Sequence, residues 1–154
     1  MRLEWGKRQW MHLCPVAQWR CMDVGEWLAQ TTPGFQEIHE QIGQIIKARW
    51  PDARLEVAGE GTYEMPSYVI PIENPPDADA WRGTMPRDVF IIAPTEKKAG
   101  ITIHVWHPNV PYLLKDHAET LAAAGYKPMV GCLQWNRKSP PDLDAFAALL
   151  DTLT

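Results

Sequence analysis

Residues 88–107, DVFIIAPTEKKAGITIHVWH, decide the fold of this chain. Two apolar runs, 89–93 and 101–106, are separated by a polar turn with two lysines and a glycine, and this pattern predicts two consecutive β-strands. The first run is apolar on both faces, which is typical of a central strand. The second run alternates, because successive side chains of a strand point to opposite faces. One face has Ile101, Ile103 and Val105, and the other has Thr102, His104 and Trp106.

Amphipathic helices are predicted before and after these two strands. A short helix covers 24–30 after the N-cap residue Asp23, and a longer one covers 32–49, where apolar side chains recur at helical spacing. Two more helices follow, at 110–124 and 139–153. The buried stripes are Phe35, Ile38, Ile42, Ile45 and Ile46 in the second helix, and Leu143, Phe146, Ala147, Leu150 and Leu153 in the last.

Three further strands and a long loop complete the pattern. The strands are predicted at 54–58, 66–70 and 128–135, and the proline-rich segment 71–87 is predicted to be an exposed loop. The last strand is expected to place on one face Val130, Cys132 and Gln134. The predicted order is α-α-β-β-β-β-α-β-α. Short connections between strands favour a mainly antiparallel sheet of about five strands with helices packed on one face, an α+β domain.

Composition and charge exclude several classes of protein. The 154 residues, 45% hydrophobic and 22% charged, are typical of one globular domain. The net charge is −4 and basic residues occur only in isolated pairs, so we expect no nucleic-acid partner. No apolar run approaches the roughly 20 residues of a membrane span, and no signal-peptide core is present. Three cysteines without export signals predict reduced thiols and a cytoplasmic location.

Residues 1–22 form an N-terminal extension to a domain predicted at 23–154. The extension has three tryptophans among basic residues and no sustained period. It either packs these tryptophans on the domain or frays, and a third interpretation takes Met22 as the natural start. Cys14 and Cys21 are too far apart for the C-x-x-C pair of a zinc or redox site.

Two stretches resemble known motifs and fail at one position each. Residues 39–43, HEQIG, begin like the H-E-x-x-H zinc helix, but glycine occupies the place of the second ligand. Residues 59–64, GEGTYE, begin like a dinucleotide fingerprint, but Glu64 replaces the third glycine and would repel a pyrophosphate. No Ser/His/Asp or Cys/His arrangement can be assembled from the sequence, so we do not expect an enzyme.

His104 and His107 have a spacing that resembles a pair of metal ligands. On a continuing strand this odd separation points them to opposite faces, and they can share an ion only if the chain turns before Pro108. The alternative is a half-buried strand histidine and a separate histidine near the start of the next helix. Cys132 is interpreted as a small hydrophobic residue of the core.

Acidic residues are concentrated on the first two predicted strands and their turns. They are Glu56, Glu60, Glu64 and Glu73. They can form a solvated sheet edge, where charges prevent edge-to-edge aggregation. The same oxygen ligands can hold a ferrous or other divalent ion weakly, and the predicted metal set is then Glu60, Glu64 and His104. No cofactor is expected, and weakly bound iron is the alternative.

Three stretches together resemble the YdhG-like family. They are residues 60–68 (EGTYEMPSY), residues 101–106 (ITIHVW), and the C-terminal GCLQW with DLDAFAALL. The resemblance covers about residues 23–153. The family is a bacterial domain of unknown function, and its members are often labelled intracellular iron chaperone, frataxin-like.

The resemblance implies a small cytosolic binding or accessory domain without chemistry of its own. Its ligand is expected against the sheet face of Thr102 or at the turn 60–64. The candidate ligand-binding residues are His104, Trp106, Tyr63, Tyr68 and Trp135. The alternatives are weak Fe(II) binding through the metal set above, and an enzyme with its site on the polar sheet face. The partner is then a small ligand or a protein, and the many tryptophans also permit a homodimer.

Overall fold

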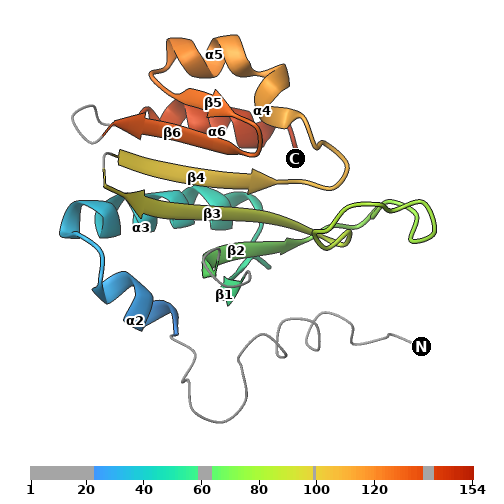
Figure 1. Ribbon diagram of the computed structural model, residues 1–154, viewed down its shortest axis with the longest axis horizontal. Coiled ribbons are helices and arrows are strands. Elements are labelled where there is room, and N and C mark those ends of the chain that lie inside the picture. Colours follow the sequence, from blue (N-terminus) through green and yellow to red (C-terminus); the bar gives the residue numbers. More distant parts are fainter. Residues whose placement is uncertain (1–22, 59–63, 99, 137–140) are drawn as a thin grey trace.

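The computed structural model describes residues 23–58, 64–98, 100–136 and 141–154. Within these ranges, five helices flank a six-stranded sheet in which all neighbouring strands are antiparallel. The strand order is β1-β2-β3-β4-β6-β5 (Figure 1). The predicted α+β class is confirmed, with six strands in place of about five. The N-terminal extension, residues 1–22, lies outside the described residues.

The helices and strands of the described ranges have the following bounds. The helices are α2 (Val24–Ala29), α3 (Pro33–Arg49), α4 (Leu113–Asp116), α5 (Ala118–Ala123) and α6 (Leu143–Asp151). The strands are β1 (Arg54–Ala58), β2 (Met65–Pro71), β3 (Val89–Lys97), β4 (Gly100–Trp106), β5 (Lys127–Met129) and β6 (Cys132–Asn136).

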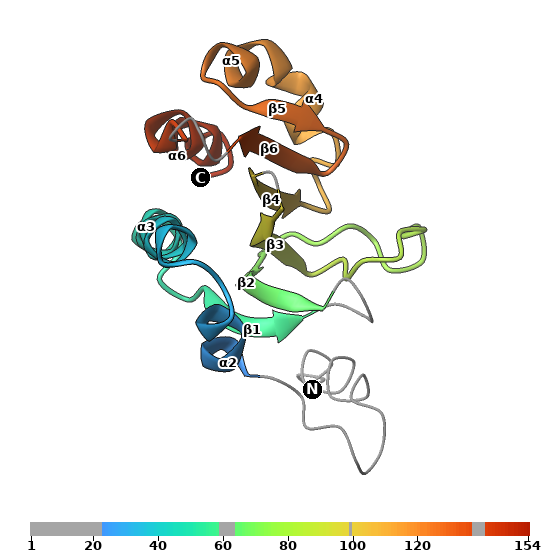
Figure 2. The same ribbon diagram turned by 60° about the vertical axis from the view of Figure 1, so that its left-hand side comes forward.

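One face of the sheet packs against helices and contains the core. Figure 2 shows α3 and α6 on the same side of the sheet, with α4 and α5 beside the edge strand β5. The register places Tyr68 opposite Ile92 and Ile92 opposite Val105, so these side chains share that face. We name it the helix face. Its buried side chains include Tyr68, Ile70, Phe90, Ile92, Ile103, Val105, Leu133 and Trp135.

Helix α3 begins where the sequence predicts. Thr32 is its N-cap and accepts a hydrogen bond from the backbone N–H of Phe35 at 3.3 Å, and Pro33 is the first helical residue. The carboxylate of Glu96, on β3, accepts hydrogen bonds from the backbone N–H of Thr32 at 3.2 Å and from its hydroxyl. A negative charge at this position also interacts favourably with the helix dipole. The sheet therefore contributes directly to the start of the helix.

The single helix expected at 110–124 is divided into α4 and α5. His117 lies between them with φ −111° and ψ 17°, outside the helical region, and its side chain makes no capping hydrogen bond. Leu114 and Leu121 are nevertheless buried. The break between α4 and α5 is therefore compatible with the burial of these two leucines.

The single strand expected at 128–135 is the hairpin of β5 and β6. The chain turns at Val130 and Gly131, and Gly131 has a φ of 74°, which glycine adopts without steric cost. Val130 is 97% exposed. The prediction that Val130 shares a sheet face with Cys132 and Gln134 is therefore wrong, because Val130 belongs to the turn and to neither strand.

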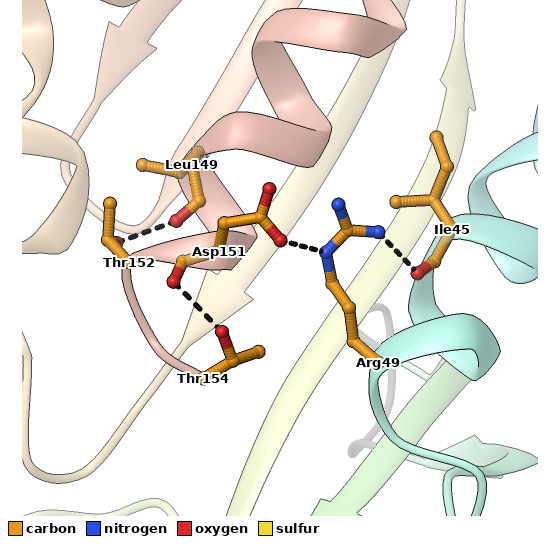
Figure 3. A network of polar contacts seen from close by, with 6 residues as sticks. All are labelled: Ile45, Arg49, Leu149, Asp151, Thr152 and Thr154. Carbon is orange, nitrogen blue, oxygen red and sulfur yellow. Dashed lines mark hydrogen bonds and ion pairs between the residues drawn. The ribbon is translucent and has the colours of Figure 1, made fainter.

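An ion pair joins the C-terminal ends of α3 and α6 (Figure 3). Arg49 Nε donates to Asp151 Oδ1 at 2.7 Å, and Arg49 Nη1 donates to the carbonyl oxygen of Ile45 at 3.0 Å. The hydrogen bond from Arg49 lowers the pKa of the Asp151 carboxyl group. Because the aspartate is exposed, water and salt screen the attraction.

We expect Arg49→Gln to lower the midpoint of urea unfolding slightly, with a smaller difference from wild type in about 1 M NaCl, where exposed ion pairs are screened. The control is Arg82→Gln, since Arg82 donates only to the nearby carbonyl oxygens of Asp79 and Trp81 in the described structure. A loss that is equally large at high salt contradicts the ion-pair explanation and assigns the effect to the contact with Ile45.

Among the helices of the described ranges, none has both the length and the apolar character that a membrane span requires.

Candidate functional site

The sheet face opposite the helices carries most of the polar residues of the central strands. The register places Thr102 between Thr95 and Gln134, and His104 between Ala93 and Cys132. We name this the polar face. Beside the apolar Ile91 and Ala93, its residues on the central strands include Thr95, Thr102, His104, Trp106, Cys132 and Gln134. The sequence prediction that Thr102, His104 and Trp106 share one face is thereby confirmed, and the neighbouring strands extend that face.

Two nitrogen atoms on the polar face are buried without a hydrogen-bond partner. They are Nε2 of His104 and Nε1 of Trp106, and neither finds a donor or acceptor in the described part of the chain. The two residues are separated by one position on β4, so their side chains are neighbours on the same face. A buried polar group without a partner costs about 1–3 kcal/mol, and native proteins contain few of them. The pair is the most unusual polar feature of this face.

The long loop between β2 and β3 contributes an aromatic side chain to the polar face. The centroid of the Trp81 ring is 6.2 Å from that of Trp106, with the rings at 65° to each other. Trp81 Nε1 donates to the carbonyl oxygen of Met85 at 3.0 Å, which holds the indole within its own loop. Arg87 Nη1 donates to the carbonyl oxygen of Pro76 at 2.8 Å and joins two parts of the loop. The loop therefore presents Trp81 in a fixed orientation beside Trp106.

Burial on the polar face favours a neutral imidazole and a protonated thiol. Burial lowers the pKa of His104, and the positive charge of Lys97 lowers it further. Burial raises the pKa of the Cys132 thiol, and Lys97 opposes this rise. Neutral imidazole offers one donor and one acceptor, whereas the indole nitrogen is a donor only. The site can therefore bind a group that accepts one hydrogen bond from Trp106 and exchanges another with His104.

The predicted ligand-binding residues do not form one site. His104 and Trp106 lie on the polar face, whereas Tyr68 and Trp135 lie on the helix face, 3% and 6% exposed. The ring of Trp135 packs edge-on against Tyr126 at a centroid distance of 5.4 Å. Tyr63 lies outside the described residues. The sheet thus separates two of the predicted aromatic residues from the other two.

The predicted metal set is described only in part. Glu60 lies outside the described residues, and Glu64 is half-buried directly before β2. No group of three His, Cys, Asp or Glu side chains that could hold a metal ion occurs among the residues the structure describes. Iron binding by Glu60, Glu64 and His104 stays a prediction.

The two histidines of the HVWH stretch lie on opposite sides of the sheet, as the odd spacing predicts. His104 is on the polar face, whereas the ring of His107 lies 5.0 Å from that of Phe90, a residue of the helix face. His107 Nδ1 also accepts a hydrogen bond from the backbone N–H of Asn109 at 3.1 Å. The two imidazoles therefore do not form a common metal site in this conformation.

Two features of the polar face are not predicted by the sequence. Cys132 was expected in the core, but it is half-buried on the polar face directly opposite His104. Trp81 was expected only as part of an exposed loop, and it contacts Trp106. The pairing of β4 with β6 brings the cysteine to the histidine, and the sequence has no local signal for a pairing between non-consecutive strands.

A second buried polar cluster lies on the helix face. His39, on α3, is 3% exposed, and its ring centroid lies 5.5 Å from that of Tyr68. His39 Nδ1 is 3.5 Å from the Tyr68 hydroxyl oxygen, which is long for a hydrogen bond, and its Nε2 has no partner among the described residues. Burial lowers the pKa of His39 to about 4 and raises that of Tyr68 to about 12. Packed side chains surround this cluster, so it is a feature of the core.

Comparison with protein-family models, with curated proteins and with solved structures finds no match to this chain.

Proposed function

We propose that the chain is a small binding domain whose ligand occupies the polar face at His104 and Trp106. The observation that carries the proposal is the pair of buried nitrogen atoms without partners on one strand. A ligand that supplies their missing partners would recover the desolvation cost that each of them carries in the free protein. Helices α3 and α6 lie on the other side of the sheet and do not cover this face (Figure 2).

The aromatic neighbours favour a ligand with a flat or apolar part beside its polar group. Trp81 and Trp106 meet at an angle, and indole rings contribute large contact area at low conformational cost. Binding sites combine such apolar surface with a few convergent polar groups. The absence of catalytic activity, the cytoplasmic location and the absence of a nucleic-acid partner stay predictions that rest on the sequence.

The NMR signals of the indole N–H groups test this proposal directly. In ¹⁵N-labelled protein, the Trp106 signal is identified by its loss in Trp106→Phe. We expect a panel of small carboxylates, heteroaromatic compounds and metal ions to contain a member that shifts the Trp106 signal. The Trp135 signal is the control, because that indole is buried on the opposite face and should not move.

The outcome that contradicts the proposal has two parts. The first part is that no member of the panel shifts the Trp106 signal. The second is that the Trp106 indole proton exchanges with water as fast as that of a free indole. Rapid exchange would mean that water already hydrates this nitrogen, and the reason for expecting a ligand there would be lost.

A stability measurement provides a second test. We expect His104→Leu to leave the free energy of unfolding unchanged or to raise it by up to about 2 kcal/mol, since it removes a buried nitrogen that has no partner. Urea unfolding followed by circular dichroism measures the change. The control is Leu133→Ala on the adjacent strand, a fully buried position where a loss of about 2–5 kcal/mol is expected. A loss of more than about 1 kcal/mol in His104→Leu contradicts the idea that the imidazole lacks a structural partner.

A further inference from the structure

Three side chains with soft or borderline donor atoms form one row across the polar face. His104 on β4 is the register partner of Cys132 on β6, and Cys132 is in turn the register partner of Met129 on β5. Register partners on neighbouring antiparallel strands point to the same side of the sheet. An imidazole, a thiol and a thioether therefore lie side by side on three consecutive strands.

The hydrogen-bond pattern shows that His104 and Cys132 are the closer type of cross-strand pair. The backbone N–H of Val105 donates to the carbonyl oxygen of Gly131 at 3.0 Å, and these two residues flank the pair. His104 and Cys132 are then a non-hydrogen-bonded pair, in which Cα atoms lie about 4.5 Å apart and side chains approach most closely. Neighbouring strands are about 4.8 Å apart, so the side chains from β4 and β5 can meet over Cys132 on β6.

Cys132 forms no disulfide and His104 Nε2 forms no hydrogen bond within the described residues, although Nε2 itself is buried. Cys132 is half-buried, and Met129 is 43% exposed at the end of the β5 strand. Burial keeps the pKa of His104 low, so its imidazole is neutral as a metal ligand must be.

We propose that His104, Cys132 and Met129 form a site for a soft monovalent metal ion of the copper(I) class. The proposal rests on the proposed function, because the site occupies part of the polar face. Thiolate and thioether ligands select copper(I), whereas hard ions prefer carboxylate oxygens. The described residues bring no cluster of three His, Cys, Asp or Glu side chains together, so this row offers a hard ion no carboxylate set.

Charge favours a monovalent over a divalent ion at this row. Binding replaces the proton of the Cys132 thiol by the metal ion, the proton passes to the solvent, and no oxidation or reduction occurs. One thiolate and one monovalent ion are together neutral, which suits a half-buried position near the positive charge of Lys97. A divalent ion would leave an uncompensated positive charge there.

A competition titration tests the site with copper(I) alone as the probe. The full chain carries Cys14→Ser and Cys21→Ser, so that these two thiols, which lie outside the described residues, do not contribute. Copper(I) is added without oxygen in competition with bicinchoninate. We expect one equivalent to bind, Cys132→Ser to abolish binding at this site, and His104→Leu and Met129→Leu each to weaken it at least about tenfold, the lower limit seen even for residues that only support a metal ligand.

The matched control is Met65→Leu, a methionine on β2 that the register places away from this row. It should bind copper(I) as the background chain does. A second measurement, alkylation of Cys132, uses the background chain itself, so substitutions in the site cannot affect its folding. One equivalent of copper(I) should protect Cys132 from iodoacetamide, as mass spectrometry of the alkylated peptide can measure.

Three results overturn the proposal. Undiminished copper(I) affinity in Cys132→Ser, or unchanged alkylation of Cys132 in the presence of copper(I), removes the ion from this row. An anaerobic Fe(II) titration followed by calorimetry can instead place the metal site at the glutamates. That result requires binding heat that is lost in the double variant His104→Ala with Glu60→Ala and is unaffected by Cys132→Ser. If copper(I) fails while a carboxylate or heteroaromatic compound still shifts the Trp106 indole signal, the binding domain stands and the metal inference alone has failed.

Discussion

Gly43→Ala is expected to lower the free energy of unfolding by about 2–3 kcal/mol, the upper part of the range for overpacked cores. A Cβ atom at Gly43, on α3, would lie 2.3 Å from the hydroxyl oxygen of Tyr68 and 3.1 Å from its Cζ. Tyr68 is 3% exposed and cannot move into solvent without opening the core. The helix can therefore approach the sheet this closely only with glycine at that position. Urea unfolding of the single variant measures the cost.

Two matched variants separate this contact from the general effect of alanine in a helix. Gly34→Ala lies on the same helix with nothing within 4 Å of the added atom, and should stabilise the protein by up to about 1 kcal/mol. Tyr68→Phe removes the nearest atom, so Gly43→Ala should cost less in that background, and a double-mutant cycle measures the difference. Equal effects of alanine at both glycines, or strictly additive effects with Tyr68→Phe, contradict the close-approach explanation.

Acidification from pH 7 to about 4 is expected to remove up to about 3 kcal/mol of stability through His39 alone. The pKa of His39 is lowered by burial from 6.5 in the unfolded chain to about 4 in the folded protein. Between these values the unfolded chain binds a proton that the folded protein does not, so stability falls as the pH falls through this window. One pKa unit corresponds to about 1.4 kcal/mol, which sets the upper limit.

The difference between wild type and His39→Leu isolates this contribution from that of other titrating groups. Burial also lowers the pKa values of His104 and His107, so both proteins should lose stability in acid through these two residues. Wild type should lose more, because His39 adds its own share. The free energy of unfolding in urea, measured at several pH values, gives the two profiles. Parallel profiles of the two proteins between pH 6.5 and 4 would contradict the prediction, because they would show that His39 has the same pKa in the folded and the unfolded state.

The sequence predicts the fold well where one periodicity runs through a whole element. The apolar stripe of α3 and the alternation of β4 are both long enough to fix which residues are buried, and Phe35, Ile42 and Ile103 are in the core as expected. The prediction fails at residues 128–135. A strand that contains a turn looks continuous when the turn residues are Val130 and Gly131, since valine is itself a strand-forming residue.

The candidate site is predicted less completely, because it depends on pairing between distant strands. Alternation along β4 is enough to place His104 and Trp106 on one face. Which residues lie beside them depends on the register of β4 with β6 and on the return of the loop that carries Trp81. The side of the sheet to which Tyr68 and Trp135 point depends likewise on register, and a shift of one residue would reverse it. Local sequence patterns do not contain that information.

The strand order also bears on how quickly the sheet can form. Among the described strands, four of the five pairings join strands that follow each other in the chain, and the fifth joins β4 to β6 across α4, α5 and β5. Pairings between near neighbours cost little loop-closure entropy and favour rapid folding. The chain can therefore assemble most of its sheet from local hairpins. The pairing of His104 with Cys132 depends on the one strand pairing that must wait for a long-range closure.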